Sequence, residues 1–370
     1  MANFIIQGGK EITGEIAVSG SKNSTLPALA ASLLFQNPIE FKNIPQIEDI
    51  FRMQELMSSI EINHTLDSAL VRKFRGSVLA IGPYVARFGL ASFPHPGGCK
   101  IGARPIDMFI HGWEAMGARC FIPPRVERGD GLYSVDTTSG LMGCDYAFRV
   151  SSVTGTESMI MTAVLATGTT ILRNCAKEPE VIALADFLNN NGAKISGVGT
   201  SEITIEGRGG KLLDSNVPFV APPDRIEAGS FILLGALTSP KLVVRGCILS
   251  EQKALIDVLD RAGVSIDIRG NEIAVSKPSA LRPFHIRTEE FPGFPTDLQA
   301  PATIPPRRLT ALMGALKSAT FFKWIPPLPE ASRTRSIPRP PHRKASQEME
   351  PKTIPYALPM ISSREAKKSR

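Results

Sequence analysis

The segment Leu184–Glu206 reads LADFLNNNGAKISGVGTSEITIE, and it is the most informative part of the chain about architecture. It starts with an apolar stripe at helical spacing and continues through Gly192. A glycine directly after such a stripe is typical of a helix that ends on a left-handed residue. Residues 202–206 then alternate between polar and apolar, which predicts a half-buried strand. The segment therefore predicts a helix, a turn and a pair of short strands.

The same pattern occurs twice more in the chain. Ile110–Cys120 reads IHGWEAMGARC, and Ile256–Val275 reads IDVLDRAGVSIDIRGNEIAV. The glycine steps are Gly117, Gly192 and Gly263, which are 75 and 71 residues apart. A period of this size indicates a fold built from copies of one supersecondary unit.

A short strand comes before several of these helices. Three segments have strand character and end in Asn or Gly: Ile39–Asn43, Thr169–Asn174 and Lys241–Gly246. The repeating unit is thus predicted as strand, helix, strand and strand. The first copy departs from it, because the helical segment Glu48–Ile60 is followed almost directly by Leu70. We expect about one strand–turn–strand to be missing there.

The charge of the chain is unevenly distributed. The chain has 370 residues, 43% of them hydrophobic, and a net charge of +7. That length and composition favour a large core and more than one domain. Residues 301–370 hold 14 Lys+Arg and 4 Asp+Glu, so residues 1–300 hold 28 and 31, a net charge of −3. The basic character comes from the tail, and bulk charge gives no reason to expect nucleic-acid binding by the rest of the chain.

The cysteines and the N-terminus point to the cytoplasm. No two cysteines have CxxC spacing and their number is odd, which argues against a zinc site and a disulfide framework. Scattered single cysteines suit a reducing compartment. Residues 1–10 do not resemble a signal peptide, and no apolar run is long enough to span a membrane. The histidines have no metal-ligand spacing, so no metal is expected. No cofactor is expected either. The five cysteines are Cys99, Cys120, Cys144, Cys175 and Cys247.

The tail, residues 301–370, breaks the pattern of the chain. It holds 12 prolines, a composition that excludes a sustained helix or a central strand, and we expect it to be disordered. One interpretation is a basic, proline-rich docking segment. The favoured one is a segment without function that arises from a shifted reading frame or a sequence error, because the repeat stops in the middle of a unit.

Two polar clusters are candidates for chemistry. Ser19–Ser24 (SGSKNS) is a turn before an apolar helix, where free N–H groups and Lys22 would attract an anion, with Asn23 beside it. The alternative is an ordinary helix cap. Phe294–Gln299 (FPTDLQ) places Asp297 at the start of an apolar segment, and there too a cap is the simpler interpretation.

The third cluster is a glycine-rich loop around a cysteine. Pro96–Asp107 reads PGGCKIGARPID, with Lys100 and Arg104 near Cys99. Neighbouring cations favour a thiolate or a bound anion. The alternative is a turn that carries an incidental cysteine. The other four cysteines lie in segments that suggest packing alone.

Together these segments resemble the UDP-N-acetylglucosamine 1-carboxyvinyltransferase family of enolpyruvyl transferases. The resemblance covers about residues 1–300, and the Cys99 loop is its most specific part. The segments that carry it are SGSKNSTLPALAASLL (19–34), GPYVARFG (82–89), PGGCKIGARPIDM (96–108), KEPEVIALADFLNNNGAKISG (177–197), PDRIEAGSF (223–231) and FPGFPTDLQA (291–300).

This resemblance implies an α/β fold of two inside-out α/β barrels, each built from βαβαββ units. The first domain would be residues 22–222. The second would combine residues 1–21 with 223–300 and would be incomplete, because the family continues after the Asp297 motif in a way that residues 301–370 do not match. We therefore also consider that the chain is an inactive remnant that retains at most nucleotide-sugar binding.

The resemblance also implies a reaction. The family transfers the enolpyruvyl group of phosphoenolpyruvate to the 3-hydroxyl of UDP-N-acetylglucosamine and releases phosphate, in the first committed step of peptidoglycan synthesis. Cys99 would be the proton donor and Asp297 the base. Lys22 and Arg104 would bind phosphoenolpyruvate, with Asn23 beside Lys22.

The nucleotide sugar would contact a second set of residues. The shikimate-pathway transferase is the nearest alternative, and the Cys99 loop argues against it. The expected nucleotide-sugar contacts are Arg75, Arg104, Pro105, Ile106, Asp107, Met108, Ser152 and Val153.

Overall fold

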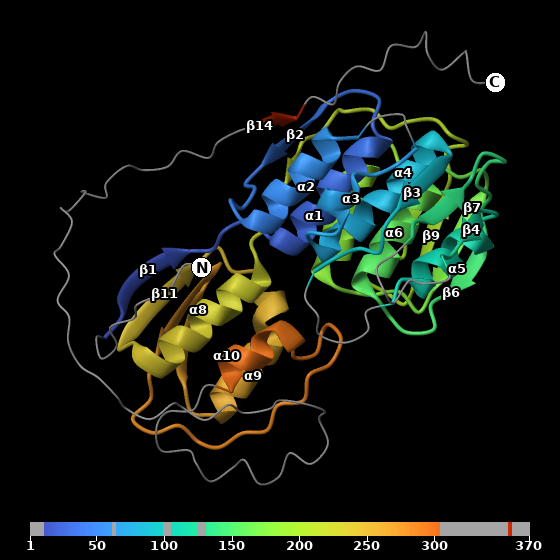
Figure 1. The fold of residues 1–370 in the computed structure, drawn as a ribbon. Coiled ribbons are helices and arrows are strands. Elements are labelled where there is room, and N and C mark those ends of the chain that lie inside the picture. The colour runs from blue at the N-terminus through green and yellow to red at the C-terminus, as the bar shows by residue number, and fades with distance from the viewer. Residues whose placement is uncertain (1–10, 61–63, 99–104, 124–130, 304–353, 357–370) are drawn as a thin grey trace, which may run out of the picture.

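The computed structural model describes residues 11–60, 64–98, 105–123, 131–303 and 354–356. Buried apolar side chains form two separate cores. The first core runs from Leu26 to Ala221, and the second runs from Ala228 to Leu298. Figure 1 shows the first core in blue to green and the second in yellow and orange, with β1 from the N-terminal end joining the second.

The first core holds helices α1 to α7 and strands β2 to β10. The helices are α1 (Lys22–Ala31), α2 (Glu48–Ser58), α3 (Ser68–Val71), α4 (Ile81–Phe88), α5 (Asp107–Ala115), α6 (Val153–Val164) and α7 (Pro179–Asn189), with 3₁₀ turns η1 (Ser32–Leu34) and η2 (Arg75–Ala80). The strands are β2 (Ile39–Lys42), β3 (Leu90–Phe93), β4 (Arg119–Phe121), β5 (Tyr133–Asp136), β6 (Asp145–Ala147), β7 (Thr169–Arg173), β8 (Ile195–Ser196), β9 (Glu202–Glu206) and β10 (Phe219–Val220).

Three small sheets surround the helices of the first core. Their strand orders are β10-β2-β14, β3-β5-β4 and β6-β7-β9-β8, where β14 is Ile354–Tyr356. In β7 and β9 the second and fourth residues are buried and the ends are exposed, so each strand has one face inward. Helix α6 is buried on all sides from Gly155 onward, and α1 is buried from Ser24 onward. A helix that is buried all round belongs to the interior of a fold, so helices fill the centre and sheets cover it.

The second core is smaller and contains one sheet, in the order β1-β11-β13-β12. Strands β1 and β11 are parallel, and β13 is antiparallel to both β11 and β12. Helix α8 lies against β11 and β13. The elements are β1 (Thr13–Ala17), α8 (Arg225–Thr238), β11 (Lys241–Arg245), α9 (Leu249–Arg261), β12 (Ser265–Arg269), β13 (Glu272–Ser276), η4 (Thr296–Leu298) and α10 (Gln299–Ala302).

The predicted glycine steps are confirmed. Gly117, Gly192 and Gly263 have φ values of 92°, 98° and 82°, and each stands between a helix and a strand. A second set of left-handed residues ends the strands that precede the helices. Asn43, Asn174 and Gly246 have φ values of 55°, 56° and 79°. Asn and Gly adopt this conformation at the lowest cost, which explains why these residue types recur at the ends of the predicted strands.

The irregular first copy also agrees with its prediction over the described residues. After α2, residues 64–67 contain an isolated bridge from Thr65 to Ser92, and α3 follows directly. Two described parts of the tail differ from the expectation of disorder: Pro301 and Ala302 belong to α10, and a short strand follows further along. Ile354–Tyr356 forms β14, which pairs antiparallel with β2 at the edge of its sheet. A proline can occupy an edge strand because no ladder partner is needed on one side, so the composition excluded a central strand but not this one.

Candidate active site

Two segments, Ser19–Lys22 and Ala221–Asp224, connect the cores, and the backbones of these segments are hydrogen-bonded to each other. The backbone N–H of Ser21 donates to the carbonyl of Pro222 at 2.7 Å, and that of Asp224 donates to the carbonyl of Ser19 at 2.9 Å. A Cβ built on Gly20 would lie 1.8 Å from the carbonyl oxygen of Asn43, so the backbones meet too closely for any side chain. These contacts fix the position of one core relative to the other.

The first turns of α1 and α8 share an acidic cap. Asp224 Oδ1 accepts hydrogen bonds from the backbone N–H groups of Ile226 and Glu227, at 2.8 and 3.0 Å, and so caps α8. Its other oxygen, Oδ2, accepts from the N–H of Lys22 at 3.1 Å. Ser21 caps α1 by accepting from the N–H of Ser24. One carboxylate thus orients the N-terminus of a helix from each core toward the same region.

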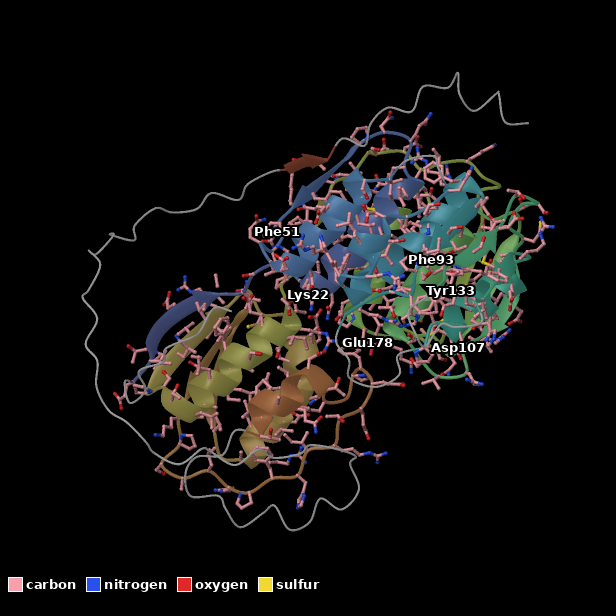
Figure 2. All side chains as sticks on the ribbon, viewed as in Figure 1. Lys22, Phe51, Phe93, Asp107, Tyr133 and Glu178 are labelled. Atoms are coloured by element: carbon pink, nitrogen blue, oxygen red, sulfur yellow. The ribbon has the colours of Figure 1, made fainter. Side chains whose placement is uncertain are left out.

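A cleft of about 1450 Å³ lies between the cores at this junction. Figure 2 shows Lys22 and Glu178 where the two cores meet. The described cleft wall mixes both signs of charge. Its cationic residues are Lys22, Arg72, Lys73, Arg75, Lys177 and Arg225, and its acidic residues are Asp49, Glu157, Glu178, Glu180, Glu289, Glu290 and Asp297.

Five of the predicted site residues line this cleft together, although they come from distant parts of the chain. They are Lys22, Asn23, Arg75, Val153 and Asp297. The Lys22 ammonium lies 3.4 Å from Asp49, and both side chains are nearly half exposed, so the charge of Lys22 remains accessible to a ligand. Ser152 caps α6 by accepting from Gly155 N–H at 3.1 Å, and the first residue of α6, Val153, lies in the cleft wall.

The predicted contacts 105–108 lie beside the cleft and not in its wall. Arg75 Nη2 donates to the carbonyl of Pro105 at 3.2 Å, which links this segment to the cleft. Ile106 is 3% exposed and packs in the first core, and Met108 is partly buried against it. Asp107 starts α5 and pairs with Arg149 at 3.4 Å. Their contact with a ligand stays a prediction.

Cys99 and Arg104 lie outside the described residues. Gly98, which directly precedes Cys99, lines the cleft. The thiols of the four described cysteines are weakly acidic, so few thiolates form at these positions. Burial raises the pKa of Cys120 and Cys175 to about 12 and that of Cys247 to about 11, and it also raises the pKa of Cys144. This agrees with the expectation that these four cysteines pack in the structure.

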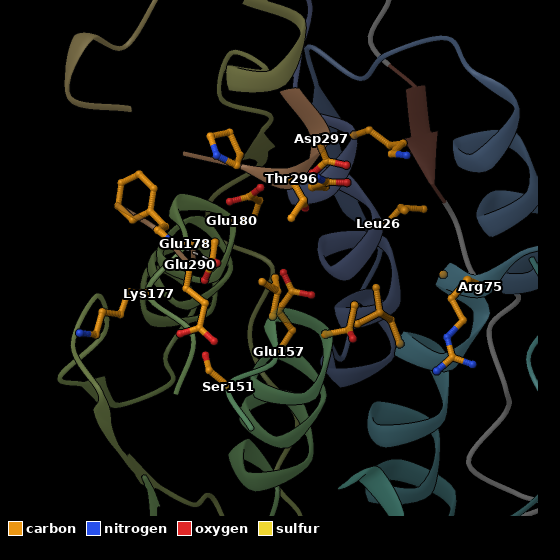
Figure 3. A pocket seen from close by; sticks show the side chains of 18 of the residues that line it. Leu26, Arg75, Ser151, Glu157, Lys177, Glu178, Glu180, Glu290, Thr296 and Asp297 are labelled. Carbon is orange, nitrogen blue, oxygen red and sulfur yellow. Dashed lines mark hydrogen bonds between the residues drawn. The ribbon is translucent and has the colours of Figure 1, made fainter. Parts of the chain in front are cut away.

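Sequence analysis missed a charged cluster on the floor of the cleft. Arg225, at the start of α8, forms a 3.0 Å ion pair with Glu180 of α7, and the two side chains are 11% and 5% exposed. Glu178, the residue before α7, accepts a long 3.5 Å contact from the N–H of Phe291. Glu157 of α6 is 1% exposed and lies near both glutamates (Figure 3). A glutamate within the otherwise uncharged α6 sequence VTGTESMIMTAV was the available signal.

Two of the acids near this cluster resist ionisation. Burial and the neighbouring Glu180 and Glu178 raise the pKa of Glu157 well above its ordinary value. Burial also raises the pKa of Glu251 in α9 to about 7, although Arg225 acts in the opposite direction. Glu157 is therefore harder to ionise than an ordinary glutamate, and Glu251 titrates close to neutral pH.

The described residues set two further limits. Among them, no group of three or more His, Cys, Asp or Glu side chains is arranged to hold a metal ion. Within the same part of the chain, every helix is too short or too polar to cross a membrane.

Comparison with known proteins assigns the fold. The family model of EPSP synthase (3-phosphoshikimate 1-carboxyvinyltransferase) matches residues 6–308. The enolpyruvyl transferase NikO from Streptomyces tendae superposes with a TM-score of 0.69 at 21% identity, over 80% of this chain and 73% of that one. EPSP synthase from Acinetobacter baumannii gives 0.57 at 18% identity, over 76% and 68%. These likenesses show a mixed α/β fold of the enolpyruvyl transferase class.

Curated relatives define the family within that class. The UDP-N-acetylglucosamine 1-carboxyvinyltransferase of Koribacter versatilis is 41% identical over 321 residues, which cover 81% of this chain and 72% of the relative. The protein of the same name from Campylobacter fetus is 39% identical over 312 residues, covering 80% and 73%. The chain belongs to the family of UDP-N-acetylglucosamine 1-carboxyvinyltransferases.

Proposed function

We propose that this protein transfers the enolpyruvyl group of phosphoenolpyruvate to the 3-hydroxyl of UDP-N-acetylglucosamine and releases phosphate, the step that commits this sugar to peptidoglycan. The observation that carries the proposal is the convergence of Lys22, Asn23, Arg75 and Asp297 in one cleft between two cores, in a chain whose relatives bear this enzyme's name. The cysteine loop at Cys99 favours this reaction over the shikimate-pathway one.

The chemistry follows from the residue types. Asp297 accepts the proton of the sugar 3-hydroxyl while the oxygen of that hydroxyl bonds to C2 of phosphoenolpyruvate. Cys99 gives a proton to C3. The deprotonated Cys99 then takes a proton from C3 as phosphate leaves C2 with the electrons of the C–O bond, and the double bond is restored. Lys22 and Arg104 neutralise the charge of phosphoenolpyruvate, and Asn23 supplies a hydrogen bond beside them.

In this proposal the nucleotide sugar binds beside phosphoenolpyruvate, against a different set of residues. Arg75, the segment 105–108 and the start of α6 at Ser152 and Val153 contact it. Support comes from the 3.2 Å contact of Arg75 with Pro105 and from the position of Val153 in the cleft wall. Arg75 and the N-terminus of α6 both favour the negative charge of a diphosphate.

The finer architecture is part of the proposal. The first core corresponds to an inside-out barrel domain of residues 22–222. The second core corresponds to a domain of residues 1–21 and 223–300. Two separate apolar cores, joined by crossings at Ser19–Lys22 and Ala221–Asp224, support this division. We place the enzyme in the cytoplasm, where scattered single cysteines remain reduced.

Phosphate release from phosphoenolpyruvate tests the function. We expect the purified chain to release phosphate when UDP-N-acetylglucosamine is present and to stop when the sugar is omitted or Cys99 is changed to Ala. Lys22→Met should raise KM for phosphoenolpyruvate at least about tenfold, because it removes a charge-assisted hydrogen bond. Lys253→Met, on the exposed side of α9, is the matched control. Folded protein that releases no phosphate would contradict the proposal.

A further inference from the structure

Glu157 stands out among the groups that the proposed reaction leaves unused. It belongs to the second turn of α6, its side chain is 1% exposed, and it lines the floor of the cleft. Its Oε1 atom is buried and has no hydrogen-bond partner among the described residues. A buried carboxyl group that borders a cleft and lacks a partner keeps hydrogen-bonding capacity for a ligand that enters the cleft.

The surroundings of Glu157 favour the neutral acid. Glu178 and Glu180 lie near it, while Arg225, one of the cations that line the cleft, is already bound to Glu180. Lys22 of α1 and Arg75 of η2 line the same cleft, but neither contributes to the raised pKa of Glu157. A neutral carboxyl group carries an O–H donor as well as an acceptor oxygen. At this position it can therefore donate a hydrogen bond, which a carboxylate cannot.

A metal ion does not account for the cluster. Among the described residues, no three acidic side chains converge in a way that would hold a cation. A ligand oxygen that accepts a hydrogen bond suits a neutral acid at this position. Glu157 lies one turn along α6 from Val153, on the wall that the proposed function gives to the nucleotide sugar. Close to two other carboxyl groups, an uncharged oxygen of the sugar is a better partner than the anionic phosphoenolpyruvate.

We propose that Glu157, on the cleft floor in Figure 3, is a specificity-determining residue. It donates a hydrogen bond to an uncharged hydroxyl or carbonyl oxygen of the bound nucleotide sugar. This proposal rests on the proposed function, because it takes UDP-N-acetylglucosamine as the ligand. Glu157 then makes the enzyme prefer a nucleotide sugar that carries this oxygen, because an analogue without that oxygen would leave a buried donor unpaired.

Calorimetric titration of the full chain with UDP-N-acetylglucosamine tests this at pH 7. Glu157→Gln keeps a donor of similar shape and should leave Kd within about threefold, whereas Glu157→Leu should weaken binding about tenfold or more. The KM for phosphoenolpyruvate should stay within about twofold in Glu157→Gln. Glu206→Gln, at an exposed position of β9 outside the cleft, is the control. Thermal melts establish that each variant is folded.

Infrared difference spectroscopy adds a readout that packing alone would not change. The wild type should show the carbonyl band of a protonated carboxyl group, absent in Glu157→Gln, and this band should shift when the nucleotide sugar binds. A band that does not shift, or equal affinity of the folded Leu variant and the wild type, would overturn the role of Glu157 alone. Failure of the wild type to bind the nucleotide sugar would overturn the proposed function and this inference with it.

Discussion

Arg225 and Glu180 form a buried ion pair that joins the two cores. Their 3.0 Å contact connects the first residue of α8 with the second residue of α7, and the guanidinium carbon of Arg225 also lies 5.8 Å from the ring centroid of Phe291. Because both partners are shielded from water, removal of one leaves an uncompensated buried charge.

Arg225→Met should therefore lower the free energy of unfolding by about 3–5 kcal/mol. The double variant Arg225→Met/Glu180→Leu should recover a large part of that loss, because no lone charge remains. Urea denaturation measures both effects. Asp257→Asn, which breaks the exposed Lys253–Asp257 pair, should change stability by less than about 1 kcal/mol. Equal losses at the buried and exposed pairs would show that the Arg225 pair is not buried in solution.

Gly20→Ala should destabilise the junction through a steric clash. Its Cβ would lie 1.8 Å from the backbone oxygen of Asn43, which cannot rotate away as a flexible side chain can. We expect a loss of about 1–3 kcal/mol, typical of forced overpacking. Gly246→Ala is the comparison, because it has open space around it and carries the cost of a positive φ alone, about 1 kcal/mol. A Gly20 variant as stable as the Gly246 variant would contradict this account.

Thiol labelling should separate Cys99 from the other cysteines. With pKa values raised to about 12 for Cys120 and Cys175 and about 11 for Cys247, these groups stay protonated at pH 8 and react slowly, because the thiolate is the nucleophile. Brief treatment with iodoacetamide at pH 8, followed by peptide mass analysis, should modify Cys99 first. The Cys99→Ala variant should then take up little label on the same timescale. Preferential labelling of one of the other cysteines would refute this order.

Glu251 should make stability depend on pH. Burial raises its pKa from the ordinary value of 4.5 to about 7 in the folded protein, so between these values the folded state keeps a proton that the unfolded state has lost. Stability from this group is therefore highest below about pH 4.5 and falls as pH rises through 7. Because the side chain is partly exposed, we discount the effect to about 1 kcal/mol.

Glu251→Gln removes this dependence. The variant should resemble the wild type at pH 4.5 and be more stable than it at pH 8, as measured by urea denaturation at each pH. Glu206→Gln, at an exposed position on β9, should follow the wild type throughout. If Glu251→Gln loses stability between pH 4.5 and 7 as steeply as the wild type does, other groups are responsible.

Local sequence was sufficient to predict the repeating unit and several residues that line the cleft. The positions of Gly117, Gly192 and Gly263 could be predicted because a left-handed helix end depends on local backbone sterics. Lys22, Asn23, Cys99, Arg104 and Asp297 were singled out from local motifs, and the family resemblance added the other predicted site residues. Neither the local motifs nor the family resemblance depends on knowing which residues are in contact in the folded protein.

Long-range packing, in contrast, established which charges face one another. Glu180 and Arg225 are 45 residues apart, and each looks like an ordinary charged residue near the start of its helix. The single glutamate of α6 could be noticed in the sequence, but the sequence of α6 does not say which charged groups pack near it. Burial and pairing depend on how the two cores are placed around the crossings at Gly20 and Pro223, and these contacts are set by the whole chain rather than by neighbours in sequence.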